Sequence, residues 1–329
     1  MRVLRFLGNL LLAVVLVVLS ALVLLTGFGL VISRAWEDAA YDDGVEGGAW
    51  VEVEKQPIYY RIWEPEQGSS AVGGTLVLVH GLDVEGLQTW NSNAQALANS
   101  GFTVVALDLK GFGHSVRDGS PTYTLRGQAT LVARVLEQLK VTRATVVGHG
   151  WGSAVALQLA SEYPQLVQRL VLLAPQVYRD PLAFYRPVIK VQYVGPYLGR
   201  ALAWAMTSGD PFWTWLRRRG FHDQTAVTSS YLNEIRQPTH VTGTIAALLA
   251  MAASPREEVL PKTISAIKAP TLILLGQEDI YVPSQDAKRL ESALPGSRLV
   301  ILPEAGHYVH IERSTDVNRA ITQFSEVQP

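Results

Sequence analysis

Four residues in this sequence have side chains suited to acid–base chemistry and lie beside glycine-containing turns. They are His80, His149, Asp279 and His307. A histidine next to a carboxylate can act as a general base, because its pKa lies near neutral pH and the acid orients the ring. The chain has no cysteine, so thiolate catalysis and disulfides are excluded. Its seven histidines lack the spacing of metal ligands, and we predict no metal and no other cofactor.

Each of these residues follows an apolar run that is predicted to be a buried strand. Apolar runs without alternation, separated by helical patterns, indicate a parallel sheet covered on both faces. An antiparallel pair at 49–54 and 57–63 precedes them. The predicted parallel strands are 75–79, 102–107, 143–147, 169–173, 271–275 and 298–302. The fold class is therefore α/β with a mostly parallel eight-stranded sheet, and such sheets bind ligands at the carboxyl ends of their strands.

The region 176–262 interrupts this alternation. It contains no clear strand and is rich in aromatic side chains, Trp204 and Trp213 among them. We predict a helical domain inserted between two strands of the sheet. The core of the protein then comprises residues 49–175 and 263–329.

The N-terminal segment 1–34 has a different composition. No charge occurs over 6–32, and a helix of that length spans roughly 40 Å, more than the hydrocarbon core of about 30 Å. The apolar part of a signal peptide is shorter, about 7–15 residues. We predict a transmembrane helix with residues 3–32 in the lipid bilayer, and keep a cleaved signal peptide as the alternative. The acidic stretch 35–48 is predicted to be a tether.

The distribution of charge indicates orientation and partners. Arg2 and Arg5 precede the apolar helix and Arg34 follows it, which favours a cytoplasmic N-terminus and an extracytoplasmic main domain. The net charge of −1 does not indicate a basic surface for binding nucleic acid, and we predict no nucleic-acid partner. We interpret the basic run 217–219 as a solvated helix end, with contact to anionic lipid headgroups as the alternative.

The order of the turn motifs resembles that of the α/β-hydrolase fold family over roughly residues 50–325. The motifs are His80-Gly81, the stretch 108–115, the glycine-rich turn 148–152, the stretch 276–283 and Gly306-His307. The resemblance implies an ester hydrolase or lipase-like fold in which region 176–262 is the cap that shapes the substrate pocket. A small-molecule ligand is the partner that this fold implies.

The resemblance also assigns roles to individual positions. In the family's order of nucleophile, acid and base, these roles fall on position 150, Asp279 and His307. The oxyanion hole is implied to consist of the backbone N–H groups of Leu82 and Trp151. Candidate substrate-binding residues are His80, Gly81, His149, Trp204 and Trp213.

The sequence departs from the family at the nucleophile, because position 150 is glycine where the family has serine. The turn is strained, and glycine adopts positive φ without a Cβ clash, so Gly150 is compatible with the fold but not with acyl-enzyme chemistry. Ser115, Ser153 and His149 lie nearby, and we interpret all three as packing residues rather than replacement nucleophiles.

Three functions are compatible with this pattern. The first is an ester hydrolase for apolar or lipid-like esters, inactivated by replacement of its serine, for example by engineering. The second is a natural pseudo-hydrolase that binds a ligand or partner without catalysis. The third is a non-covalent mechanism in which His307, oriented by Asp279, activates water directly.

Overall fold

The computed structural model describes residues 2–35, 47–65, 74–83, 85–118, 123–183, 185–190, 195–207, 211–236, 241–254 and 263–326. Most of the predicted tether, 35–48, lies outside the described residues. The predicted domain boundaries therefore stay a prediction at this point of the chain.

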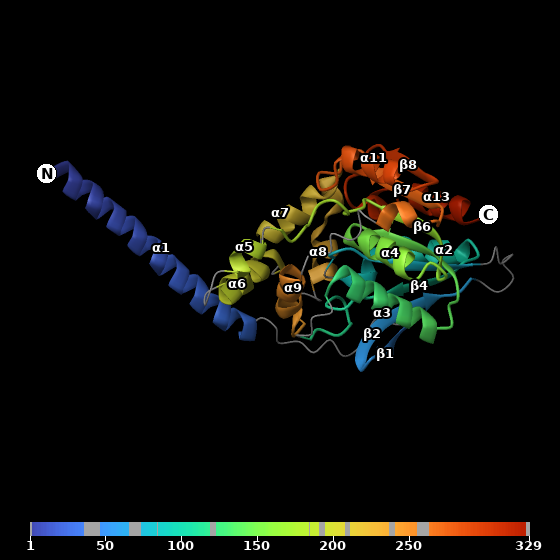
Figure 1. Cartoon of the computed structure of the whole chain (residues 1–329), viewed down its shortest axis with the longest axis horizontal. Helices are drawn as coiled ribbons and strands as arrows, with labels where there is room; N and C mark the ends of the chain where they lie inside the picture. The colour runs from blue at the N-terminus through green and yellow to red at the C-terminus, as the bar shows by residue number, and fades with distance from the viewer. Residues whose placement is uncertain are drawn as a thin grey trace.

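An eight-stranded sheet forms the centre of the protein (Figure 1), as the apolar runs predict. The strand order is β1-β2-β4-β3-β5-β6-β7-β8, with β1–β2 and β2–β4 antiparallel and every other neighbouring pair parallel. The strands are β1 Gly48–Val53, β2 Gln56–Trp63, β3 Thr75–Val79, β4 Thr103–Leu107, β5 Ala144–His149, β6 Val167–Leu173, β7 Thr271–Gly276 and β8 Ser297–Leu302.

Helices cover both faces of the sheet. Strand β3 illustrates the division, because successive side chains of a strand point to opposite faces. Val77 and Val79 pack towards α3, α4 and α11, whereas Leu76 and Leu78 pack towards α2, α12 and α13. The helices are α2 Ala94–Asn99, α3 Leu125–Gln138, α4 Trp151–Glu162, α11 Ser284–Ala293, α12 Val309–Glu312 and α13 Ser314–Glu326.

The sequence also predicts helices over 91–100 and 312–324, and both differ in detail from the observed ones. The helix predicted over 91–100 is shorter, and a 3-10 turn, η1 Gly86–Trp90, precedes it. The carboxylate of Asp108 accepts a hydrogen bond from the backbone N–H of Leu87 at 2.6 Å, which pins this turn from a distant loop. The helix predicted over 312–324 is divided into α12 and α13.

The elements described between β6 and β7 are helices and 3-10 turns, and the bounds 176–262 of the inserted region stay a prediction. Its helices are α5 Tyr185–Ile189, α6 Gly195–Thr207, α7 Pro211–Arg219, α8 Ser229–Arg236 and α9 Thr244–Ala253, with 3-10 turns η2 Gln224–Ala226 and, near β7, η4 Ile264–Ala266. They lie together to one side of the sheet, between it and the N-terminal helix (Figure 1).

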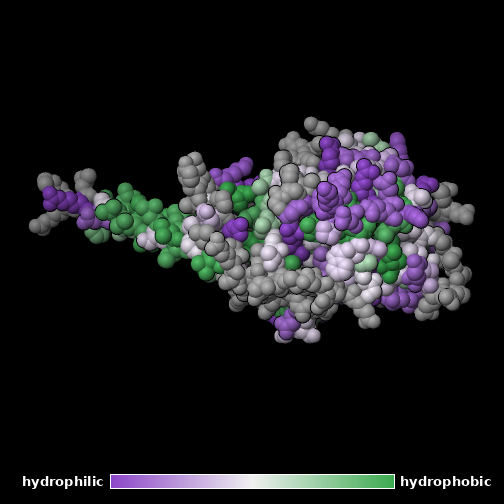
Figure 2. Space-filling view, turned by 90° about the horizontal axis from the view of Figure 1, so that it is seen from below, coloured by the Kyte–Doolittle hydropathy of each residue, from purple (hydrophilic) through white to green (hydrophobic). Residues whose placement is uncertain are grey.

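The N-terminal helix α1, Arg2–Ala35, projects from the rest of the molecule (Figure 1). Its stretch Arg5–Gly29 has a mean hydropathy of 3.0 and is long and apolar enough to cross a membrane, a property that a signal sequence shares. The space-filling view shows this helix as a hydrophobic rod (Figure 2). Among the described residues, α1 packs mainly against α6, with Leu22, Thr26 and Gly29 as its least exposed side.

Candidate active site

The turn that joins β5 to α4 has Gly150 at its apex. This residue has φ +52° and ψ −117°, a region that residues with a Cβ rarely adopt. The glycines on either side are needed for space. A Cβ on Gly152 would lie 2.2 Å from the carbonyl oxygen of His80, and one on Gly148 would lie 2.6 Å from the carbonyl oxygen of Gly152. The glycine-rich pattern therefore builds a turn in which a helix begins directly against the end of β3.

His307 and Asp279 form a buried pair at the carboxyl ends of β7 and β8. His307 Nδ1 lies 2.9 Å from Asp279 Oδ2. The other carboxylate oxygen of Asp279 accepts the backbone N–H groups of Tyr281 at 2.8 Å and Val282 at 3.0 Å. These contacts hold the acid in one orientation and leave Nε2 of His307 as the nitrogen that can move a proton.

The contact between His307 and Asp279 shifts the pKa values of both groups in the directions that favour a charged pair. Burial favours neutral His307, but the charge and hydrogen bond of Asp279 outweigh it and raise the pKa of the imidazole. Burial likewise opposes ionisation of Asp279, yet His307 and the two backbone N–H groups lower the pKa of the carboxyl. His307 is thereby a stronger base than a free histidine.

Nε2 of His307 faces the space above Gly150. A Cβ built on Gly150 would lie 3.3 Å from His307 Nε2 and 3.5 Å from Gln176 Oε1. A short side chain at position 150 would thus point at the base. Gln176 is not among the candidate site residues, and no sequence signal marks it. The structure brings its amide to the same space, and its backbone N–H donates to the carbonyl of Gly150 at 3.0 Å.

The two backbone positions predicted as the oxyanion hole lie at the ends of β3 and β5. Trp151 is the first residue of α4, so its N–H belongs to the helix N-terminus, where backbone donors have no intrahelical partner. Leu82 follows β3, next to Gly81, whose Cα approaches the carbonyl oxygen of His149 so closely that a Cβ there would lie 3.2 Å from it. Their role stays a prediction.

His80 is fully buried and both ring nitrogens contact the main chain. Nδ1 lies 2.8 Å from the carbonyl oxygen of Gly81, and Nε2 accepts the N–H of Leu109 at 2.9 Å. Burial, opposed by Asp83, lowers the pKa of this imidazole to about 4, so the ring is neutral near pH 7. These contacts fix the loops after β3 and β4. A substrate contact through His80 stays a prediction, with no contact here that favours it.

The two nearby serines are engaged in the fold. Ser153 Oγ donates to the carbonyl oxygen of Gly148 at 2.7 Å. Ser115 Oγ donates to the carbonyl oxygen of Asp108 at 2.6 Å and accepts the N–H of Tyr59 at 2.9 Å. Both are buried, in keeping with their interpretation as packing residues.

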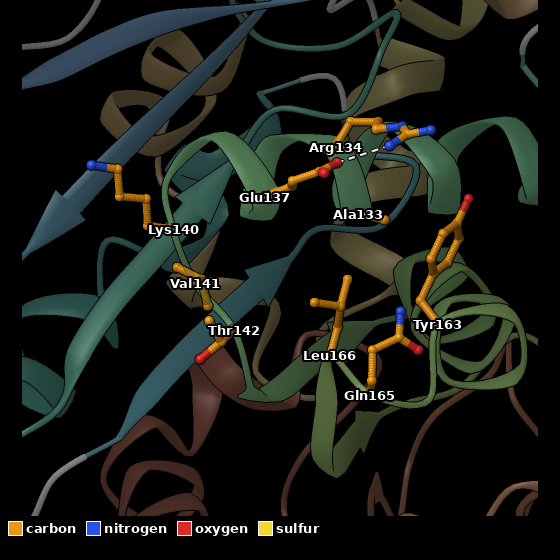
Figure 3. Close-up of a pocket in the computed structure, with 9 residues that line it drawn as sticks. All are labelled: Ala133, Arg134, Glu137, Lys140, Val141, Thr142, Tyr163, Gln165 and Leu166. Carbon is orange, nitrogen blue, oxygen red and sulfur yellow. Dashed lines mark hydrogen bonds and ion pairs between the residues drawn. The ribbon is translucent and has the colours of Figure 1, made fainter.

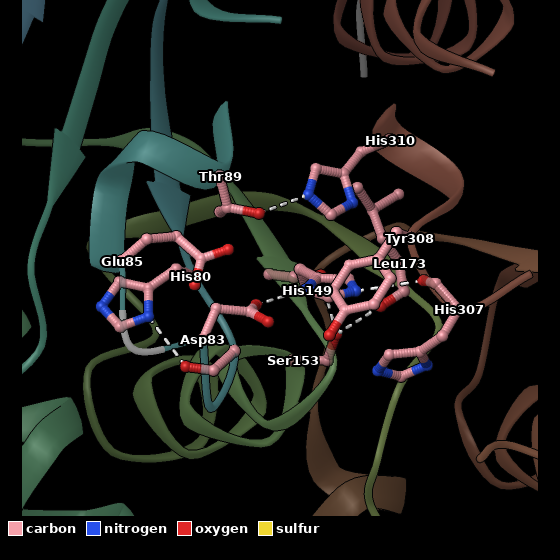
Figure 4. A network of polar contacts seen from close by, with 12 residues as sticks. His80, Asp83, Glu85, Thr89, His149, Ser153, Leu173, His307, Tyr308 and His310 are labelled. Carbon is pink, nitrogen blue, oxygen red and sulfur yellow. Dashed lines mark hydrogen bonds and ion pairs between the residues drawn. The ribbon is translucent and has the colours of Figure 1, made fainter. Parts of the chain in front are cut away.

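His149 belongs to a buried polar cluster beneath the site (Figure 4). Its Nδ1 lies 3.2 Å from Asp83 Oδ2, and its Nε2 lies 3.1 Å from the carbonyl oxygen of His307. Burial, opposed by Asp83, lowers the pKa of His149. The neutral ring can donate to only one of these two acceptors. His149 therefore joins the turn at Gly150 to the loop that carries the base.

Arg217, from cap helix α7, is the cation of this cluster. Its guanidinium donates to Asp83 Oδ1 at 2.9 Å and to the hydroxyl of Tyr308 at 2.9 Å. It also forms very short contacts with Glu85 and Tyr231. Burial raises the pKa of Glu85 to about 7, although Arg217 opposes that shift.

The position of Arg217 corrects the sequence interpretation of the basic run. Arg217 is only 6% exposed, whereas Arg218 and Arg219 are exposed. Three consecutive arginines look like a solvated helix end, and no sequence signal separates the first from the others. Its partners Asp83 and Tyr308 directly follow Leu82 and His307 in the sequence, so one cap residue holds two of the loops that form the site.

Of the two tryptophans predicted to bind substrate, the structure describes the side chain of Trp204 but not that of Trp213. Trp204 packs edge-on against Phe28 of α1, with ring centroids 4.9 Å apart, and against apolar side chains of α5 and α9. The side chain of Trp213 lies outside the described part of the chain. Substrate contact by either tryptophan stays a prediction.

A surface hollow of about 380 Å³ lies elsewhere (Figure 3). Its lining includes Arg134, Glu137, Val141 and Leu166, from the end of α3 and the segments that precede β5 and β6. The hollow is therefore at the amino ends of the strands, the edge opposite His307. Because ligands bind at the carboxyl ends in such sheets, we do not assign it to the site.

Comparison with known proteins identifies the family. The profile described as the alpha/beta hydrolase fold matches residues 74–314. The chain belongs to the α/β-hydrolase fold family, as the motif order predicts.

Individual relatives agree with this. The chain is 28% identical over 262 residues to the uncharacterized hydrolase YugF of Bacillus subtilis (strain 168), covering 76% of this chain and 89% of that protein. A meta-cleavage product hydrolase mutant from Pseudomonas fluorescens IP01, complexed with acetates, has a TM-score of 0.69 at 20% identity, covering 84% of this chain and 96% of that one. The enol-lactonase from Burkholderia xenovorans LB400 has a TM-score of 0.68 at 22% identity, and the match covers 85% of this chain and 100% of that one.

Removal of the buried cation should destabilise the protein. We expect Arg217→Met to lower the free energy of unfolding by about 3–5 kcal/mol, because Asp83 and Glu85 are left buried without their partner. Denaturant unfolding followed by circular dichroism measures this. Arg218→Met is the matched control on the exposed side of the same helix and should change stability by less than about 0.5 kcal/mol. Equal stabilities of the two variants would contradict the assigned contacts.

The ion pair predicts how His307 titrates. Its pKa should lie above 6.5, and Asp279→Asn should lower it, since both the charge and the acceptor are lost. Titration of the imidazole ¹⁵N shifts measures this without any turnover. The contribution of His307 to stability is complete below the pKa of histidine in the unfolded chain and is lost as pH rises through its raised pKa in the folded protein. The contribution of Asp279, whose pKa is lowered, is lost only as pH falls through that lowered pKa. Asp286→Asn, on α11, is the control, and an unchanged His307 pKa in Asp279→Asn would refute the pairing.

Proposed function

We propose that this protein is a membrane-anchored α/β-hydrolase with an ester-hydrolase-type site, whose ligand is an apolar or lipid-like ester. The observation that carries the proposal is the approach of His307 Nε2 to within 3.3 Å of a Cβ built on Gly150, with Asp279 behind the ring. That arrangement aims a base at the place where the attacking atom would stand. An ester carbonyl above the turn would meet the backbone N–H groups of Leu82 and Trp151.

Because Gly150 has no side chain, water is the attacking group in the proposed reaction. His307 Nε2 takes a proton from a water molecule held in the space above Gly150, and the water oxygen attacks the ester carbonyl. The Leu82 and Trp151 N–H groups stabilise the oxyanion. The tetrahedral intermediate then expels the alcohol, which receives the proton from His307. General-base help of this kind accelerates a reaction by about 10²–10⁴-fold, so turnover is slow compared with that of a serine hydrolase.

The chemical class of the ligand is proposed from the surroundings of the site. The structural relative named an enol-lactonase acts, by its name, on a lactone, which is a cyclic ester. The cap over this site contributes apolar clusters from α5, α6 and α9. An uncharged ester with an apolar chain fits both features.

The membrane part of the proposal rests on the exposure of α1. Side chains such as Leu11, Val17, Val23 and Leu24 are 66%, 68%, 70% and 73% exposed. An exposed apolar surface of this length is unfavourable in water and favourable in lipid. We propose that α1 spans the bilayer as a single anchor, with its N-terminus in the cytoplasm and the main domain outside.

A ligand-binding pseudo-hydrolase is the second candidate. The observation that favours it is Gly150 itself, since glycine has no side chain with which to form an acyl intermediate. The buried ion pair between Arg217 and Asp83 holds helix α7 on the loop after β3 whether or not turnover occurs.

Restoring a nucleophile separates these functions. We expect Gly150→Ser to hydrolyse short aryl esters about 10³-fold faster or more, because Oγ would stand beside His307. The same variant should be about 1–3 kcal/mol less stable, since serine is strained at φ +52°. Ester assays and denaturant unfolding measure the two effects.

Gly150→Ala is the matched control, because it carries the strain without the hydroxyl. It should lose stability like Gly150→Ser and gain no activity. If the unmodified protein turns over esters and His307→Ala abolishes that, the water route is supported. Absence of ester hydrolysis in both the native and the Gly150→Ser protein would refute the hydrolase proposal in favour of the binder.

A further inference from the structure

We infer that cap helix α6 is seated at the surface of the lipid bilayer by direct packing on α1, so that the site receives its ester from the adjoining leaflet rather than from water. The inference rests on the proposed membrane anchor and deepens the proposed ester hydrolysis. It identifies the cap's bilayer-facing element and the source of the ligand. The contact between α1 and α6 carries it.

The two helices touch at backbone distance. Gly29 of α1 is buried, and a Cβ on it would lie 2.2 Å from the carbonyl oxygen of Tyr197 and 3.4 Å from the backbone nitrogen of Ala201. Only a residue without a side chain permits this approach, which resembles the close packing of helices inside membranes. Phe28 adds an edge-on contact to the ring of Trp204 at 4.9 Å.

The side of α1 in contact is a single stripe. Leu22 and Thr26 are half-buried and Gly29 is buried, at the spacing that places residues on one helical face, while Val23, Leu25 and Gly27 between them are exposed. Thr26 satisfies its hydroxyl within the helix by donating to the carbonyl of Leu22 at 2.7 Å. The remaining circumference is left for lipid.

The depth of this contact follows from the length of the helix. Residues 22–29 are the last part of the span Arg5–Gly29 and correspond to roughly 10 Å along the axis. If that span crosses the bilayer, α6 lies within about two helical turns of the hydrocarbon boundary. Its own sequence has a tryptophan and a tyrosine among aliphatic residues, a composition suited to the interface.

The contact continues from α6 to the site. Trp204 packs with Ile245, Leu249 and Ala252 of α9. On the other face of α9, a Cβ built on Gly111 would lie 3.2 Å from the Cβ of Ala247, so α9 packs against the turn that follows β4. The bilayer, the cap and the loops near the site are thereby linked through consecutive packed elements.

Two matched glycine variants test the packing of α6 on α1. Gly29→Leu must push α6 away, because its Cβ meets backbone. Gly27→Leu is the control on the same helix, since a Cβ there meets nothing within 4 Å. Both variants keep the apolar span, so pelleting with phosphatidylcholine vesicles shows whether each is still anchored. Failure of all forms to associate with vesicles would overturn both the anchor and this inference.

Cross-linking measures the contact in the full chain, which has no native cysteine. The pair Phe28→Cys with Trp204→Cys should be joined within one chain by a short bismaleimide in vesicles, because the two native rings touch. The pair Val23→Cys with Trp204→Cys is the control, because Val23 is 70% exposed and about 140° around the helix from Phe28. Equal cross-linking of the two pairs, or cross-links only between two copies, would overturn the inference.

A depth probe measures where α6 lies. A fluorophore on Leu198→Cys should be blue-shifted and quenched by spin-labelled lipids, whereas one on Arg134→Cys of α3 should be neither. Adding Gly29→Leu should abolish the effect at position 198 and adding Gly27→Leu should not. A water-exposed probe at 198 in otherwise unmodified, vesicle-bound protein would overturn the inference.

Turnover tests the source of the ligand, in the native or the Gly150→Ser protein. Gly29→Leu should slow hydrolysis of a long-chain aryl ester dissolved in vesicles roughly tenfold, because the site loses its local supply, and leave a short soluble ester unchanged. Equal loss on both esters, or on neither, would overturn leaflet supply. If no form hydrolyses any ester, the hydrolase proposal fails, while the cross-linking and depth measurements still test whether α6 packs on α1 at the bilayer surface.

Discussion

A guanidinium buried in the protein interior governs how the parts of this site are held. A charge removed from water is tolerated only when partners surround it, and Arg217 meets this requirement with Asp83, Glu85 and two tyrosines. Asp83 follows the predicted oxyanion residue and Tyr308 follows the base. The end of α7 therefore cannot leave the core without exposing unpaired charges.

Beside this rigid cluster, the turn at Gly150 is built for a side chain that the sequence lacks. The backbone keeps the strained geometry, the helix begins at once, and His307 approaches the empty position. Glycine relieves the strain and keeps the direction of the base. Because glycine has no side chain for a covalent step, the proposed reaction uses water, with the amide of Gln176 in the same space.

The N-terminal helix is part of the same architecture. It packs on α6 through a face that includes a glycine, and α6 packs on α9, which rests on the core. With α1 as the proposed membrane anchor, this packing on the cap would orient the domain relative to the bilayer, whereas an anchor joined only by a tether would leave it free to rotate.

The sequence by itself determined the α/β class, the eight strands, the family and the His307–Asp279 pair, because strand periodicity and turn motifs are local signals. Only the tertiary structure distinguished Arg217 from Arg218 and Arg219, since burial depends on partners such as Asp83 and Tyr308, which lie 134 and 91 residues away. It alone brought Gln176 beside Gly150 and Gly29 against Tyr197. Such contacts join elements whose spacing along the chain carries no periodicity, so pattern and composition cannot report them.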